Sequence, residues 1–117
     1  MMRSLLYWVA SAAFLALFAL PPAEAQSWCT NKGLSASERL ICRTPALQVL
    51  DRELNAIFRE AIRLTPPGSG VGIRESQHLW LGRRNSCGLD DACIRQAYAK
   101  RKTDLRTYIA TGNLDSE

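Results

Sequence analysis

Hydrophobic residues recur at three- and four-residue steps along much of this chain, which is the spacing of an amphipathic α-helix. The clearest stripe follows Thr44-Pro45, a helix start in which proline occupies the first helical position. The polar side of this helix carries Arg52, Arg59 and Arg63. Its apolar positions are Leu47, Leu50, Leu54, Ile57, Phe58, Ala61 and Ile62. The pattern predicts one long helix with a single buried face.

A shorter helix is predicted before it, because Ser35-x-x-Glu38 is a capping-box pattern. This helix should end near Cys42. Residues 65–72 contain two prolines and three glycines and are predicted to form a turn or loop that reverses the chain.

Two further helices are predicted after that loop. The third covers about 73–84, and its buried face would comprise Ile73, Gln77, Trp80, Leu81 and Arg84. The fourth is capped by Asp90 or Asp91 and stops at Gly112. Its apolar stripe is Ile94, Ala97, Tyr98, Leu105, Tyr108 and Ile109. No segment alternates in the manner of a β-strand, so the chain is predicted to be all-α. Short connections favour a small antiparallel bundle of three main helices plus one short N-terminal helix.

The first 25 residues have the composition of a secretory leader. Arg3 precedes an uncharged apolar run, Pro21-Pro22 ends it, and Ala23-Glu24-Ala25 fits a signal-peptidase site. The alternative is an uncleaved membrane anchor, since the run approaches the length of a membrane span. We predict a signal peptide over 1–25 and one mature domain over 26–117, with no permanent anchor. The net charge of +4 is unchanged by cleavage, because Arg3 and Glu24 both leave.

All four cysteines, Cys29, Cys42, Cys87 and Cys93, lie after this leader. A mature domain of this size needs staples, and in a periplasmic or secreted protein disulfides supply them. The spacing lacks a CxxC pair and the chain has one histidine, which argues against structural zinc. Chain entropy gives about 3 and about 2.4 kcal/mol for the local pairs, against about 4 for each longer crossed pair. Short loops close soonest, so we favour Cys29 with Cys42 and Cys87 with Cys93, although sequence leaves the crossed pairings open.

Candidate chemistry is sparse. His78 is the only histidine, and no nucleophile, base and orienting group can be assembled around it, so we expect no catalytic residue, metal or cofactor. Residues 68–72 lack the lysine of a phosphate-binding loop. Basic residues are spread along the chain rather than massed, so a nucleic-acid partner is not expected. The chain is therefore predicted not to be an enzyme.

One segment has the composition of a binding surface. Residues 77–87 hold a glutamine, a tryptophan and two arginines, residue types that are common in interaction hot spots. Trp80 is interpreted as a core anchor, with Arg84 stacked on it or paired with Asp51. His78 and Arg83 are candidate partner-binding residues. Asp90 and Asp91 in the predicted Cys87 to Cys93 loop form a candidate acidic patch.

The order of these residues resembles the lysozyme-inhibitor LprI-like N-terminal domain family over nearly the whole predicted mature chain. The most specific part is Gln77-x-x-Trp80-Leu81-x-x-Arg84 leading into the third cysteine. Upstream, the resemblance includes Glu38, Ile41-Cys42, Leu47, Leu50-Asp51 and Leu54, and downstream it includes Tyr98 and Arg101. The family usually has aspartate after that arginine, where this chain has Asn85, so a local salt bridge or cap is expected to be lost. We interpret Glu38, Asp51, Gln77, Trp80, Leu81 and Arg84 as structural.

The resemblance implies a secreted or periplasmic helical protein that acts by binding another protein, with a lysozyme as the partner of the family's named member. The alternative is a cell-envelope interaction module that inhibits nothing and binds another envelope protein or anionic wall material. Sequence leaves the partner and the oligomeric state open.

Overall fold

The computed structural model describes residues 26–114, and the predicted leader lies outside that range. The elements in order are a 3-10 helix η1 (Ser27–Thr30) and four α-helices. These are α1 (Ala36–Arg43), α2 (Pro45–Leu64), α3 (Val71–Asn85) and α4 (Asp91–Thr111). Residues 26–114 contain no strand, so the predicted all-α class is confirmed. The predicted short first helix and three main helices are all present, and η1 is an addition to the prediction.

Helix α1 begins with the predicted capping box. The Ser35 hydroxyl accepts a hydrogen bond from the Glu38 backbone N–H at 3.1 Å, and Glu38 Oε1 accepts one from the Ser35 N–H at 2.9 Å. Two otherwise unpaired backbone donors are satisfied in this way. The helix buries Ser37 and Ile41, and the Ser37 hydroxyl donates to the Gly88 carbonyl at 2.6 Å. Helix α1 is thereby tied to the turn between α3 and α4.

Helix α2 begins at Pro45 as predicted, but Thr44 caps it without its side chain. The Thr44 carbonyl accepts from the Gln48 N–H at 3.1 Å. The Gln48 amide in turn donates to the Cys42 carbonyl at 2.8 Å, which satisfies an end carbonyl of α1. Of the arginines predicted on the polar side of α2, Arg52 is half-buried rather than exposed.

The other two main helices agree with the prediction to within two residues at their starts. Helix α3 begins at Val71 rather than at 73, because Gly72 is accommodated in its first turn. Asp90 is the residue that caps α4, and its Oδ1 accepts from the Cys93 N–H at 3.1 Å. Gly112 ends α4 in the left-handed conformation at φ 74°, which glycine adopts without strain.

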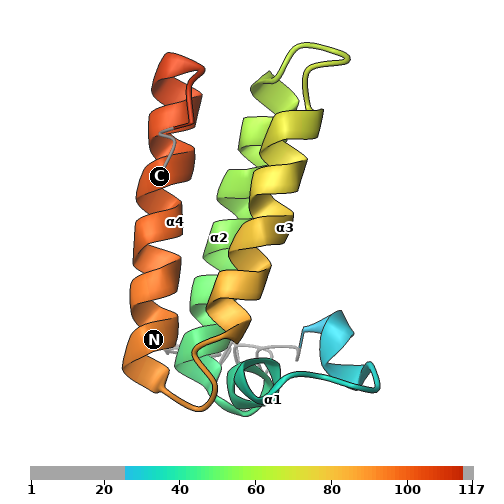
Figure 1. Ribbon diagram of the computed structural model, residues 1–117, viewed down its shortest axis with the longest axis vertical. Coiled ribbons are helices and arrows are strands. Elements are labelled where there is room, and N and C mark those ends of the chain that lie inside the picture. Colours follow the sequence, from blue (N-terminus) through green and yellow to red (C-terminus); the bar gives the residue numbers. More distant parts are fainter. Residues whose placement is uncertain (1–25, 115–117) are drawn as a thin grey trace, which may run out of the picture.

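The three main helices run antiparallel in sequence order, with α1 crossing one end of the bundle (Figure 1). Helix α4 packs against both α2 and α3, and α1 contacts η1, α2 and α3. The buried apolar core is contributed by all four α-helices. Its members are Ile41, Leu47, Leu54, Ala61, Ile73, Trp80, Ile94, Tyr98 and Leu105.

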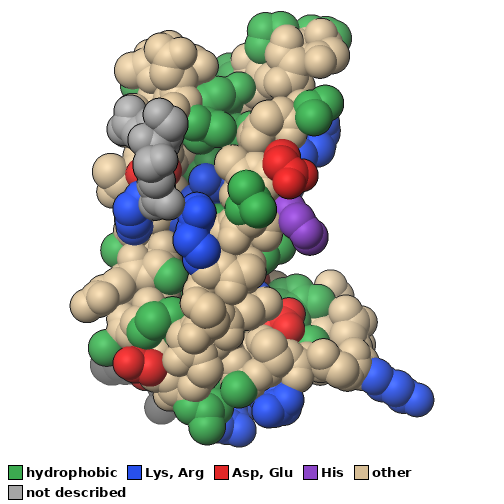
Figure 2. All heavy atoms as spheres, viewed as in Figure 1, with side chains coloured by type: hydrophobic (Ala, Val, Ile, Leu, Met, Phe, Trp, Pro, Cys, Tyr) green, Lys and Arg blue, Asp and Glu red, His purple; other side chains and the backbone are tan. Residues whose placement is uncertain are grey.

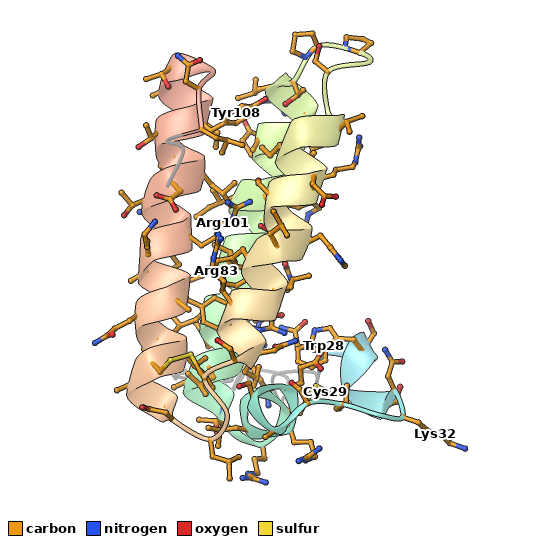
Figure 3. The ribbon with its side chains drawn as sticks, in the orientation of Figure 1. Trp28, Cys29, Lys32, Arg83, Arg101 and Tyr108 are labelled. Carbon is orange, nitrogen blue, oxygen red and sulfur yellow. A yellow bond between two sulfur atoms is a disulfide. The ribbon has the colours of Figure 1, made fainter. Side chains whose placement is uncertain are left out.

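Two disulfides staple the end of the bundle near α1 (Figure 3). They join Cys29 to Cys42 and Cys87 to Cys93, with Cα atoms 5.7 and 5.6 Å apart. The favoured local pairing is confirmed. The first bridge holds η1 on α1, and the second joins the turn that follows α3 to the first turn of α4. Such bridges form and persist in an oxidising compartment, which indicates an extracytoplasmic environment for the folded chain.

Candidate functional site

A buried arginine, Arg84, lies at the centre of the polar contacts near the end of the bundle that carries the two disulfides. The Arg84 side chain is 4% exposed, and its Nη1 lies 3.5 Å from Asp51 Oδ1. Its guanidinium also lies over three aromatic rings, 5.7 Å from the centroid of Trp28, 5.6 Å from Trp80 and 6.0 Å from Tyr98. Both alternatives considered for Arg84 are therefore present together, since it contacts Trp80 and pairs with Asp51. A buried cation with its counterion and aromatic faces avoids the cost of an isolated buried charge.

Asp51 accepts hydrogen bonds from more than the arginine. The Tyr98 hydroxyl donates to its Oδ1 at 2.8 Å. Asn55 Nδ2 and Trp28 Nε1 donate to its Oδ2 at 3.2 and 3.4 Å. Burial is the main cause that raises the pKa of Tyr98 above its ordinary value, and the Asp51 charge adds to it although Arg84 acts in the opposite direction. Tyr98 is therefore a neutral hydroxyl donor at physiological pH.

Asn85 has a defined role in this network. Its Oδ1 accepts from Arg84 Nε at 3.0 Å and from Arg84 Nη2 at 2.9 Å. Glu38 Oε2 lies 3.8 Å from the same Arg84 Nη2. The asparagine thus keeps two hydrogen bonds to the arginine, while the ion pair that an aspartate would make at this position is absent.

A second buried arginine joins α3 to α4 in the middle of the bundle. Arg101 Nε donates to Gln77 Oε1 at 2.8 Å, and Arg101 Nη2 donates to Ser76 Oγ at 2.8 Å. Trp80 is 4% exposed, and its Nε1 donates to the Ala97 carbonyl at 3.1 Å. Most residues quoted for the family resemblance thus lie inside the bundle. The half-buried exceptions are Glu38, Cys42, Leu50, Leu81 and Cys87.

A surface groove of about 270 Å³ lies between α3 and α4 beside the second disulfide. We call it the α3–α4 groove, and it is lined by Trp80, Arg83, Cys87, Cys93, Gln96, Ala97, Lys100 and Asp104. Arg83 lies between the two helices in Figure 3, and Figure 2 shows Lys and Arg side chains over the same seam. Lys100 also donates to Asp104 at 3.1 Å. The groove therefore combines an apolar floor with a basic rim, in which the two cations Arg83 and Lys100 outnumber the one carboxylate, Asp104.

The four candidate partner-binding residues are not brought together. Arg83 lines the α3–α4 groove, whereas His78 is exposed on another side of α3, away from that seam in Figure 2. Asp90 is engaged as the cap of α4, and Asp91 pairs with Arg95 one turn along the helix. The expected acidic patch is thus formed by two carboxylates that each have a local structural partner.

A second hollow, of about 230 Å³, lies where η1, α1, α2 and α3 meet, and no sequence pattern predicted it. We call it the Trp28 hollow, and it is lined by Trp28, Glu38, Asp51, Asn55, Leu81 and Arg84. Trp28 precedes every predicted helix, so the periodic spacing of hydrophobic residues did not predict whether it is buried or what it contacts. Its place directly before Cys29 was the available signal, since a disulfide fixes its neighbours in space.

The described residues include no group of three or more His, Cys, Asp or Glu side chains that could hold a metal ion. None of the helices in 26–114 has the length and apolar character of a membrane span. Comparison of the chain with protein-family models, with curated proteins and with solved structures finds no match.

Proposed function

We propose that this protein is an extracytoplasmic binding protein that inhibits a lysozyme, and that it binds through the α3–α4 groove. The proposal starts from the resemblance to the LprI-like domain family. The observation that carries it concerns residues 77–87. Trp80 and Arg84 are buried in the bundle, whereas Arg83 lines an open groove. A rigid groove with a basic rim suits the binding of an acidic feature on another protein.

The chemistry of the partner supports this choice. Lysozyme cleaves its substrate with two carboxyl groups in a cleft that holds the sugar chain. An arginine in that cleft would pair with a carboxylate and exclude substrate, and arginine is favoured in such contacts because its planar fork binds a carboxylate through two hydrogen bonds. Arg83 is the groove residue suited to this role, with Lys100 nearby on the rim.

The disulfide under the groove supports a preorganised surface. Cys87 and Cys93 line the groove and also fix the turn between α3 and α4. A surface that is rigid before binding loses less entropy when the complex forms. We therefore expect binding to depend on the oxidised fold.

The experiment is the lysis of bacterial cell walls by lysozyme with increasing amounts of the exported, oxidised protein. We expect stoichiometric inhibition that is lost when the disulfides are reduced. No inhibition at large excess, tested against lysozymes of several types, would contradict the proposal.

A second candidate is favoured by the same basic rim. With a net charge of +4 and exposed cations on the α3–α4 groove, the protein would bind anionic wall polymers without inhibiting an enzyme. Retention on purified cell walls that disappears at high salt would favour this candidate. Retention that resists salt would contradict it.

A further inference from the structure

The Trp28 hollow is built from four elements and has a buried charged floor. Asp51 and Arg84 form the floor, with side chains 5% and 4% exposed. Trp28 from η1 and Leu81 from α3 supply apolar walls, and Glu38 lies at the more open side with 24% of its side chain exposed. The Cys29–Cys42 disulfide holds the segment that carries Trp28.

The charges around the hollow do not balance. Glu38 and Asp51 are two carboxylates, and Arg84 is the only cation among the residues that line the hollow. Asp51 is engaged by Arg84, Tyr98, Trp28 and Asn55. The negative charge left over is therefore centred on Glu38.

One oxygen of Glu38 is available to a ligand. Its Oε1 accepts from the Ser35 N–H, as the capping box requires. Its Oε2 lies 3.8 Å from Arg84 Nη2, which is beyond hydrogen-bonding distance, and it accepts no other hydrogen bond from the described residues. A half-buried carboxylate oxygen in this state attracts a cationic donor.

Asn55 provides a second acceptor. Its Nδ2 donates to Asp51 Oδ2 at 3.2 Å, and this contact orients the amide. Asn55 Oδ1 accepts no hydrogen bond from the described residues and so can accept one from a ligand in the hollow that it lines.

The indole of Trp28 is already used to bind a cation. It lies 5.7 Å from the Arg84 guanidinium, at a distance where the ring quadrupole attracts positive charge. Together with Leu81, it also offers an apolar surface against which the methylene stem of a lysine or arginine can pack. An anionic ligand would instead add to the unbalanced negative charge.

We infer that the Trp28 hollow binds one organic cation, a guanidinium or primary ammonium group, carried by an arginine or lysine side chain of a partner protein. The inference deepens the proposed function, on which it rests for the identity of that partner. Lysozymes of the common animal type are strongly basic, so the +4 charge of this protein opposes their approach at long range. The hollow would supply short-range attraction that the engaged Asp90 and Asp91 do not.

The first test uses butylguanidinium chloride as the probe and butylurea as its neutral analogue of similar shape. The readout is the NMR signal of the Trp28 indole N–H at constant ionic strength. We expect a saturable shift with butylguanidinium and none with butylurea. A shift that is absent or equal for the two compounds would overturn the inference.

Substitution of Glu38 tests the source of the attraction. Glu38→Gln removes the charge but keeps an oxygen for the capping box, since glutamine also serves at that position. We expect about two- to fivefold weaker binding of butylguanidinium, the range of a partly exposed ion pair. The matched control is Glu75→Gln, on an exposed part of α3 outside the hollow. Equal affinity in both variants would overturn the inference.

A second variant blocks the hollow without removing a charge from it. Asn55→Lys places a tethered ammonium four residues after Asp51, a favourable spacing on a helix. We expect the Trp28 shift to vanish while the melting temperature is maintained. A folded Asn55→Lys protein that binds butylguanidinium as the unaltered protein does would contradict the assignment.

The lysis assay separates this inference from the proposed function. If the unaltered protein inhibits lysozyme and Glu38→Gln weakens inhibition more than Glu75→Gln, the inference is supported. If inhibition is the same in both variants, the inference fails and the proposed function stands. If butylguanidinium binds but no lysozyme is inhibited, the proposed function fails and the cation site stands.

Discussion

Arg84 is the buried cation at the centre of the polar network around Asp51. It pairs with Asp51, donates twice to Asn85 and lies over three aromatic rings. Removal of one member of a buried ion pair leaves the other charge without compensation, and this costs more than the pair itself contributes.

We predict that Arg84→Leu lowers the free energy of unfolding by about 3–5 kcal/mol, the range for a broken buried ion pair. Urea denaturation of the purified protein measures this change. The control is Arg59→Leu on the exposed side of α2, where a change within about 0.5 kcal/mol is expected. Similar losses in the two variants would contradict the central place given to Arg84.

The raised pKa of Tyr98 leads to a prediction of how the stability of the fold changes at alkaline pH. Because the folded state raises the pKa of this hydroxyl, its contribution is complete below about pH 10 and is lost as the pH rises through the raised folded pKa. We expect the melting temperature to fall above about pH 10. Tyr98→Phe should be less stable at neutral pH, since Asp51 loses a donor, but should show a smaller alkaline decline. An unchanged alkaline decline in Tyr98→Phe would show that another group is responsible.

Sequence could predict part of this network. The pairing of Arg84 with Asp51 and its contact with Trp80 followed from residue types on facing helical stripes. The contacts that Trp28 and Tyr98 make with Asp51 and Arg84 did not follow from sequence. Trp28 lies before the first regular pattern, and a helical stripe places Tyr98 in the core without saying what its hydroxyl contacts. These contacts form only when segments that are far apart in the sequence come together in the fold, and no local sequence pattern encodes that.

At the scale of the helices, the ends were the most predictable feature. Capping requires particular side chains at particular positions, so Ser35, Pro45 and Gly112 could be assigned from sequence, and the cap of α4 could be narrowed to Asp90 or Asp91. The start of α3 was placed two residues late because Gly72 was counted with the loop, whereas a glycine in a first helical turn has only a modest cost. The 3-10 helix η1 is too short to have a periodic signal.

The cap of α4 gives a prediction at this scale. We expect Asp90→Ala to lower the free energy of unfolding by about 1 kcal/mol, because the Cys93 N–H loses its acceptor. Asp90→Asn should retain most of that stability, since asparagine is an equally good cap. Thermal unfolding of both variants measures the difference. Equal destabilisation by alanine and asparagine would indicate a role for the charge beyond capping.

For the whole molecule, the two disulfides should contribute unequally. The sequence separations they span are 13 and 6 residues, and the chain-entropy account gives about 3 kcal/mol for the longer loop and about 2.4 for the shorter. The Cys29–Cys42 bridge also holds Trp28 over Arg84. We therefore predict that Cys29→Ser with Cys42→Ser destabilises the protein more than Cys87→Ser with Cys93→Ser. Urea denaturation compares the two double variants, and the reverse order would contradict this account.

The binding surfaces required the assembled molecule. Arg83 could be singled out by residue type, but the α3–α4 groove exists only because two helices joined by a turn lie side by side. The acidic patch expected at Asp90 and Asp91 illustrates the opposite case. Sequence showed two adjacent carboxylates and predicted that one of them caps α4. Only the structure showed that Asp90 is this cap and that Asp91 pairs with Arg95.

The most direct test of the account compares Arg83→Glu with Arg59→Glu in the cell-wall lysis assay. Each variant replaces an exposed arginine by glutamate, so the change in net charge is the same, but only Arg83 lines the α3–α4 groove. With both proteins shown to be folded by their melting temperatures, we predict that Arg59→Glu inhibits lysozyme as the unaltered protein does and that Arg83→Glu does not. Equal inhibition by the two variants, or none by the unaltered protein, would contradict the claim that this groove binds lysozyme.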